Sequence, residues 1–335
     1  MTDSVSSSMT ISSQLFVANA RTALKIAFNQ LDVKRGGKIL VPDFICDVLI
    51  HPMLQAGLVP FYYPVTQDLV PDWRALESMA AGSNCQAIIM VHYFGQPQNI
   101  EQFQLFCSRH SLLLVEDNAH GYGGYHAGKL LGSFGDVGIS SPRKILGTPS
   151  GGIFHGASIR SSELVKNMSP FPAYHPIPFL KAVLNLVPRI RRLVKGWSDR
   201  SKNWSDPRLH QESVKPDHGI DRFSRWRIVS ADLQLIAARR RENWLAWALF
   251  ARSKGLRTVF SELHPESCPW AMPVYASDLV ERNLWLAWGA KNGITVFPWP
   301  TLPEDIILLD GDALARWEKL LCFSLDRSPP IGNNL

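Results

Sequence analysis

An aspartate and a lysine stand at the ends of two successive strand-like segments. The apolar run Leu112–Val115 leads to Asp117, and Lys144 follows after a stretch rich in glycine and serine. The carboxyl ends of strands in a parallel α/β sheet lie at one edge, where ligands bind. A carboxylate there can hold a pyridine nitrogen protonated, and a lysine can form a Schiff base with an aldehyde. This pair of residues therefore indicates chemistry with pyridoxal 5'-phosphate (PLP).

The region around these two residues alternates helical and strand-like stretches between residues 15 and 165. Apolar residues at helical spacing predict helices at Ala18–Gln30 and Val48–Ala56. Short apolar runs predict strands at Lys38–Val41, Val59–Pro64, Ala87–Val91, Leu112–Glu116 and Val137–Ser140. Short strands separated by helices indicate an α/β fold with a parallel sheet.

Four further motifs occur along the chain. They are Asn19–Lys25 (NARTALK), Val41–Cys46 (VPDFIC), Val91–Pro97 (VHYFGQP) and Trp299–Pro303 (WPTLP). Together with the segment from Asp117 to Gly152, they resemble the DegT/DnrJ/EryC1/StrS family of PLP-dependent aminotransferases, best known for making amino sugars. The resemblance spans roughly residues 15–165 and 222–310. Each motif alone is weak evidence, but all of them in family order and at family spacing are strong evidence.

The resemblance implies a fold-type I PLP enzyme. Its large domain is expected to be a three-layer α/β/α structure with a mostly parallel sheet, followed by a smaller C-terminal α/β domain. Such sites lie at subunit boundaries, so we expect a homodimer with shared active sites. The implied reaction moves an amino group from an amino acid, glutamate or glutamine, to a keto acceptor through a Schiff base on Lys144. A keto sugar or a nucleotide-linked sugar is the expected acceptor.

The resemblance also implies which residues hold the cofactor. Asp117 is expected to bind the pyridine nitrogen, and His120 the 3-hydroxyl group. The phosphate requires backbone N–H groups at a helix N-terminus together with hydroxyl groups. The expected phosphate-binding residues are Ala20, Arg21, Thr22 and Ser141, with Ser140 as the alternative source of the hydroxyl group.

Some positions in this assignment stay open. Either Phe44 or Cys46 covers the ring, because Cys46 stands where the family has an aromatic residue. Ser224 and Arg225 lie where a neighbouring subunit completes the phosphate site, but the family's asparagine is not clearly present. The strand-end residues of the third motif, His92, Tyr93 and Gln96, could face substrate or serve in packing.

The chain divides into four predicted segments. These are a flexible Ser/Thr-rich tail (1–14), the large PLP-binding domain (15–165), a basic insertion rich in proline and tryptophan (166–222) and a C-terminal small domain with a bridging helix (223–335). Within the insertion, Phe179–Val194 could form a basic amphipathic helix, and residues 179–204 could contact a membrane surface. Because Pro188 weakens such a helix, we favour a role in covering substrate or packing a dimer.

The C-terminal segment has its own pattern. Apolar spacing predicts one long helix at Ile228–Phe250. A strand, a helix and a strand are expected at Ala271–Val274, Leu284–Lys291 and Ile294–Phe297. This order indicates a small α/β domain.

Composition narrows the possible partners. The net charge of +6 favours anionic ligands such as a phosphate or a nucleotide sugar. No basic run is interleaved with a nucleic-acid-binding motif, so we expect no nucleic-acid partner. The five cysteines form neither a CxxC pair nor a zinc-site pattern, so we expect no metal. Their odd number, and the lack of a secretion signal or a long apolar run, favour a cytoplasmic protein.

Two other functions stay open. Some relatives are sugar dehydratases in which a histidine replaces the lysine, and Lys144 argues against that reaction here. Cys46 in place of an aromatic residue, and Ile145 where most members have asparagine, depart from the family pattern. These departures leave room for a catalytically degenerate PLP-binding protein with a regulatory or assembly role in polysaccharide biosynthesis.

Overall fold

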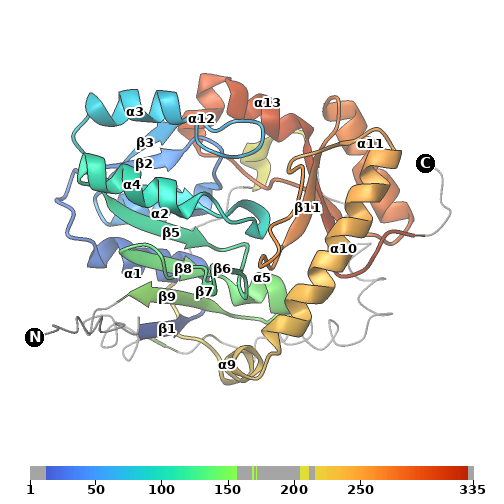
Figure 1. Ribbon diagram of the computed structural model, residues 1–335, viewed down its shortest axis with the longest axis horizontal. Coiled ribbons are helices and arrows are strands. Elements are labelled where there is room, and N and C mark those ends of the chain that lie inside the picture. The colour runs from blue at the N-terminus through green and yellow to red at the C-terminus, as the bar shows by residue number, and fades with distance from the viewer. Residues whose placement is uncertain (1–12, 157–167, 170, 172–203, 211–215, 331–335) are drawn as a thin grey trace, which may run out of the picture.

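Two β-sheets organise the protein, which we describe from a computed structural model (Figure 1). The structure describes residues 13–156, 168–169, 171, 204–210 and 216–330. We call the seven-stranded sheet with its helices the large lobe, and the four-stranded sheet with its helices the small lobe. Most of the predicted insertion (166–222), including nearly all of the possible membrane-contacting stretch 179–204, lies outside the described residues.

The large sheet has the order β1-β9-β8-β5-β4-β2-β3. Its strands are β1 (Ser13–Val17), β2 (Lys38–Pro42), β3 (Val59–Tyr63), β4 (Cys85–Val91), β5 (Leu113–Asn118), β8 (Val137–Ser140) and β9 (Gly152–Gly156). Neighbouring strands from β3 to β8 pair in parallel, whereas β9 is antiparallel to both β8 and β1. The prediction of a mostly parallel sheet is confirmed. All five predicted strands are present, and β1 and β9 extend the sheet beyond them.

Helices connect these strands and cover the sheet. They are α1 (Ala20–Gln30), α2 (Asp47–Gln55), α3 (Trp73–Ala81), α4 (Ile100–His110) and the short α5 (Pro142–Leu146). The helix α1 contacts α2 and the strands β8 and β9, whereas α4 packs on β4 and β5. A one-turn 3-10 helix (Tyr93–Gly95) follows β4, and a two-stranded hairpin, β6 (Tyr125–His126) with β7 (Lys129–Leu130), follows β5. Thus the large lobe has the layered α/β arrangement that the sequence predicts.

The small lobe contains an antiparallel sheet of order β10-β11-β13-β12. Its elements are β10 (Arg257–Thr258), β11 (Ala271–Tyr275), α11 (Leu279–Lys291), β12 (Val296–Pro298), α12 (Glu304–Leu309), α13 (Asp312–Lys319) and β13 (Leu320–Ser324). The predicted strand-helix-strand order corresponds to β11, α11 and β12. Four fully buried tryptophans fill the core of this lobe: Trp244, Trp247, Trp285 and Trp317.

Two helices join the lobes. The helix α9 (Arg222–Val229) contacts α5 of the large lobe, and α10 (Leu233–Ser253) runs from there along the small sheet (Figure 1). The predicted single helix Ile228–Phe250 is therefore wrong, because non-helical residues separate α9 from α10. The side chain of Asp232 accepts a hydrogen bond from the Leu235 N–H and so starts a new helix.

Candidate active site

The candidate active site lies at the carboxyl edge of the large sheet. Strands β8, β5, β4 and β2 are successive neighbours, and each delivers residues to this edge. Asp117 lies near the end of β5, Lys144 lies one turn into α5 after β8, and Cys46 follows β2. Because parallel strands end at the same edge, the sheet collects these residues from distant parts of the sequence.

Adjacent carboxylates in β5 serve different tasks because side chains alternate between the faces of a strand. The fully buried Glu116 accepts hydrogen bonds from His92 Nε2 (2.9 Å) and from three backbone N–H groups in the loop before β8. Burial opposes ionisation of Glu116, but these hydrogen bonds outweigh it and lower its pKa. Glu116 therefore fixes the loop that leads to Lys144.

Asp117 is also buried but has a different environment. Its Oδ1 accepts a hydrogen bond from the Ala119 N–H at 2.8 Å, which closes a tight turn. Burial raises the pKa of Asp117, and the nearby Lys144 ammonium acts in the opposite direction. A buried carboxylate of this kind gains from a cationic hydrogen-bond donor.

The histidine that follows Asp117 has a defined tautomer. His120 Nδ1 accepts a hydrogen bond from the Phe94 N–H at 3.2 Å. Burial, and secondarily the Lys144 ammonium, lower the pKa of His120 well below its usual value, so the ring is neutral. A neutral imidazole that accepts at Nδ1 carries its proton on Nε2. His120 therefore offers one N–H donor.

Lys144 faces an aromatic residue of the small lobe. Its Nζ lies 4.8 Å from the ring centroid of Trp270, which stands immediately before β11. The Trp270 ring also stacks on His120, with 4.5 Å between centroids and an interplanar angle of 28°. Sequence reasoning missed Trp270. Its only local signal is a position before a predicted strand, which many packing residues share.

The predicted phosphate site contains an orphaned hydroxyl group. Ser141 precedes α5, and its buried Oγ has no hydrogen-bond partner among the residues that the structure describes. Nearby, a Cβ atom at Gly152 would collide with the backbone of Asn19 and Ala20, so α1 begins directly against β9. The structure thus brings Ala20 close to the strand that follows the lysine helix.

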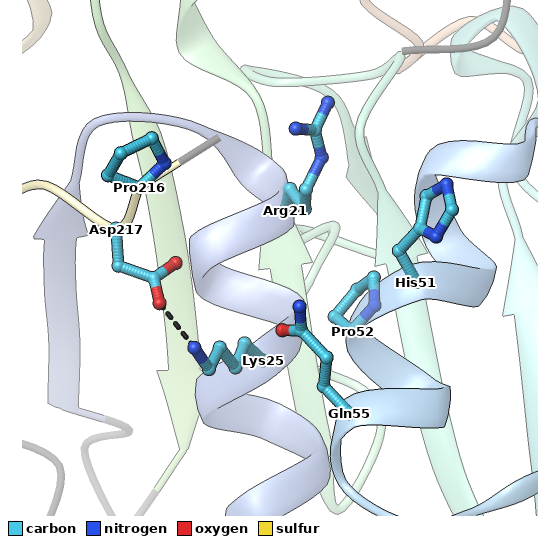
Figure 2. Close-up of a pocket in the computed structure, with 7 residues that line it drawn as sticks. All are labelled: Arg21, Lys25, His51, Pro52, Gln55, Pro216 and Asp217. Atoms are coloured by element: carbon cyan, nitrogen blue, oxygen red, sulfur yellow. Dashed lines mark hydrogen bonds and ion pairs between the residues drawn. The ribbon is translucent and has the colours of Figure 1, made fainter. Parts of the chain in front are cut away.

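Thr22 and Arg21 make other contacts in the first turn of α1. The Thr22 N–H donates to Asn19 Oδ1 (3.0 Å), and the Thr22 hydroxyl donates to Asp217 (3.1 Å). Arg21 lines a cavity of about 360 Å³ between α1 and α2 (Figure 2). Lys25 and Asp217 form a 2.5 Å ion pair on one wall of this cavity. The assignment of Arg21 and Thr22 to the phosphate stays a prediction.

The two candidates for covering the ring differ in exposure. Phe44 is fully buried, with its ring 4.9 Å from that of Trp299 and the guanidinium carbon of Arg316 5.3 Å from its own centroid. Cys46 is partly exposed, and the charge of Lys144 affects its thiol, whose pKa burial raises to about 12. Which of the two residues covers the ring stays a prediction.

Ser224 and Arg225 lie on α9. Ser224 Oγ accepts a hydrogen bond from the Ser150 N–H at 3.1 Å, and the Arg225 guanidinium carbon lies 5.6 Å from the ring centroid of Phe16. Ser224 thus supports the loop after α5 within its own chain. Their role toward a neighbouring subunit stays a prediction.

The strand-end residues after β4 pack rather than line the site. His92 pairs with Glu116, the Tyr93 hydroxyl donates to the Phe44 carbonyl oxygen (2.6 Å), and Gln96 accepts from the His264 N–H (3.0 Å).

None of the helices in the described ranges is both long and apolar enough to cross a membrane.

Comparisons with known proteins show what this chain is similar to. A model of the DegT/DnrJ/EryC1/StrS aminotransferase family matches residues 11–171. GDP-perosamine synthase of Vibrio cholerae is 28% identical over 121 residues, which are 36% of this chain and 33% of that protein. The chain spans less than half the length of the curated relatives that it matches.

Solved structures share the fold over nearly the whole chain. Helicobacter pylori PseC, an aminotransferase involved in the biosynthesis of pseudoaminic acid, has a TM-score of 0.66 at 16% identity, covering 93% of this chain and 81% of that one. The PLP form of the putative sugar aminotransferase Spr1654 from Streptococcus pneumoniae has a TM-score of 0.64 at 18% identity, covering 95% and 83%. At these identities the likeness establishes the fold.

Proposed function

We propose that this chain is a PLP-dependent aminotransferase, since residues 11–171 match the model of the DegT/DnrJ/EryC1/StrS aminotransferase family. The observation that carries this proposal is the grouping of Asp117, His120 and Lys144 at one edge of the large sheet. The amino donor is an amino acid, glutamate or glutamine. The acceptor is a keto sugar or a nucleotide-linked sugar, which the sugar-related names of the relatives support.

The residues present fit PLP. The orphaned Ser141 hydroxyl offers a buried donor to a phosphate oxygen. Asp117 is a buried carboxylate that a protonated pyridine nitrogen would satisfy. His120 supplies a single Nε2–H donor to the 3-oxygen. When bound, PLP supplies an aldehyde that takes up an amino group and a ring that withdraws electrons from the reacting carbon.

Each side chain then has a defined task. The Asp117 carboxylate would hold the proton on the ring nitrogen of bound PLP, and its buried position would exclude water from this contact. Lys144 Nζ would anchor PLP and would serve as the general base for the proton on the α-carbon of the donor. The hydrogen bond from the Ala119 N–H to Asp117 Oδ1 fixes the orientation of the carboxylate.

A visible absorbance spectrum tests this function. The purified protein is expected to show the absorbance of bound PLP, and L-glutamate is expected to bleach it. Lys144→Ala should lose this response, while Lys38→Ala should keep it, because Lys38 starts β2 at the opposite edge of the sheet. A spectrum without any PLP absorbance, even after PLP is added, would overturn the proposal. PLP absorbance that responds to no amino donor, together with no turnover, would support the degenerate PLP-binding protein instead.

We further propose a cytoplasmic homodimer with shared active sites, in which Ser224 and Arg225 serve the neighbouring subunit. Sedimentation gives the oligomeric state. Mixing Lys144→Ala with Arg225→Ala tests the sharing, because a mixed dimer would contain one site with both residues intact. Recovery of activity on mixing is expected, and two variants that stay inactive together would contradict the shared site.

A further inference from the structure

We propose that Trp270 is a positioning residue that the small lobe inserts into the active site to hold Lys144 and His120. This inference rests on the proposed transamination for its catalytic consequence, but its geometry stands alone. Lys144 and His120 both belong to the large lobe, whereas Trp270 precedes β11 of the small lobe. The same indole lies against both residues.

Hydrogen bonds fix the backbone of Trp270 on both sides. The Trp270 N–H donates to the Phe94 carbonyl oxygen at 2.9 Å. From α10, the buried Arg240 donates through Nε to the Pro269 carbonyl oxygen and through Nη2 to that of Trp270, both at 2.6 Å. Charge-assisted bonds to two successive carbonyl groups leave this segment little freedom. The indole is therefore presented by a rigid support.

A close backbone approach locks the same segment against the large lobe. Gly95 has φ +87°, and a Cβ atom there would lie 2.7 Å from the carbonyl oxygens of both Cys268 and His120. Only glycine allows the chain before Trp270 to pack this closely on the turn that carries His120. The position of the indole relative to the site is thus set by backbone contact.

The indole acts on Lys144 and His120 in different ways. The face of an indole attracts an ammonium group electrostatically. Trp270 therefore binds Lys144 Nζ while the lysine is not bonded to the cofactor. His120 packs against Trp270 and also lies beside Phe94, whose ring centroid is 5.7 Å from that of His120. The Phe94 N–H, which donates to His120 Nδ1, and the Trp270 ring together restrict rotation of the imidazole. Removing the indole takes away one constraint on each group.

Lysine methylation with carbon-13, followed by NMR of the full-length protein without added cofactor, tests the contact itself. Methyl protons above an aromatic face are shielded, so the Lys144 signal, assigned with Lys144→Arg, is expected upfield of the exposed lysines. Trp270→Leu should abolish this shift, and Trp270→Phe should keep part of it. If the Leu variant does not fold, Trp270→Met removes the ring with a more adaptable side chain. Lys129, whose Nζ lies 4.5 Å from the Phe134 centroid, is the internal control and should not change.

A second measurement tests the catalytic consequence. In the protein loaded with PLP, Trp270→Leu is expected to slow the glutamate half-reaction about tenfold at saturating glutamate, without a matching rise in KM. Trp270→Phe should recover most of the rate. An unshifted Lys144 signal in the wild type, or a Leu variant with the wild-type rate, would overturn the proposal. Because the NMR measurement needs no cofactor, its outcome is separate from a failure of the proposed function.

Discussion

Arg316 of α13 lies 3.9 Å (Nη1 to Oδ1) from Asp43, which follows β2, so a buried ion pair joins the two lobes. Arg316 also donates to the Val65 carbonyl oxygen at 2.8 Å, and Asp43 accepts from the Val65 N–H at 3.3 Å. Burial raises the pKa of Asp43 to about 6, although the Arg316 charge opposes the shift. The carboxylate is therefore poised to titrate inside the fold.

We predict that Asp43 lowers stability as the pH rises. An unfolded aspartate releases its proton near pH 4 and the folded one near pH 6, so the folded state binds more protons between these values. The free energy of unfolding should therefore fall across this window, by up to about 3 kcal/mol from this group. Asp43→Asn should remove this component. Urea denaturation of both proteins from pH 4 to 7 gives the difference, and parallel curves would contradict the prediction.

Glu116→Gln is expected to destabilise the protein by about 2–4 kcal/mol, because an amide nitrogen would face backbone donors in the buried loop. Urea denaturation at neutral pH measures the loss. The matched control is Glu101→Gln, which removes one surface pairing with His126 and should cost less than about 1 kcal/mol. Equal losses of unfolding free energy in the two variants would show that the buried hydrogen bonds of Glu116 stabilise the protein no more than a surface pairing does.

Asp117→Asn should keep the hydrogen bond that the side-chain oxygen accepts from the Ala119 N–H. It should lose the negative charge that holds a proton on the ring nitrogen. We expect PLP to bind and the glutamate half-reaction to slow about 100-fold or more. Stopped-flow absorbance with L-glutamate measures this rate. A variant that reacts at the wild-type rate would remove Asp117 from the proposed mechanism.

Thr301 links the small lobe to the start of α2. Its hydroxyl donates to Asp47 Oδ1 and lies 3.0 Å from Cys46 Sγ. Thr301→Val should cost about 1–3 kcal/mol, because the buried Asp47 carboxylate loses a donor. Thr301→Ser keeps the hydroxyl and should cost less. Thermal unfolding compares the two, and a Val variant as stable as the Ser variant would refute the bridge.

Gly95→Ala and Gly128→Ala form a matched pair. Both glycines have a positive φ, +87° and +74°, so each substitution costs about 1–2 kcal/mol in backbone strain. At Gly128 a Cβ atom would meet no atom of the described residues within 4 Å, whereas at Gly95 it would meet two carbonyl oxygens. Gly95→Ala should therefore be the more destabilising in urea unfolding. A similar loss in both variants would contradict the close packing of the segment before Trp270.

The large lobe was the easier part to predict. Its predicted strands are short apolar runs, and this signal is local. The break between α9 and α10 was missed because apolar residues continue through it, although Asp232 at the start of α10 is a recognisable cap. Most of the small sheet was found as separate elements, but its order depends on pairing that local patterns do not encode.

Apolar runs and turn residues along the chain specify where strands end, and they are enough to predict that Asp117, His120 and Lys144 lie at strand ends. The surroundings of these residues depend on tertiary packing. It assigned Glu116 to the loop rather than the site, and within the described ranges it left the Ser141 hydroxyl without a hydrogen-bond partner. It also placed Trp270 over Lys144. These relationships join residues far apart in the chain, and such contacts follow from how lobes pack, which periodicity along the sequence does not record.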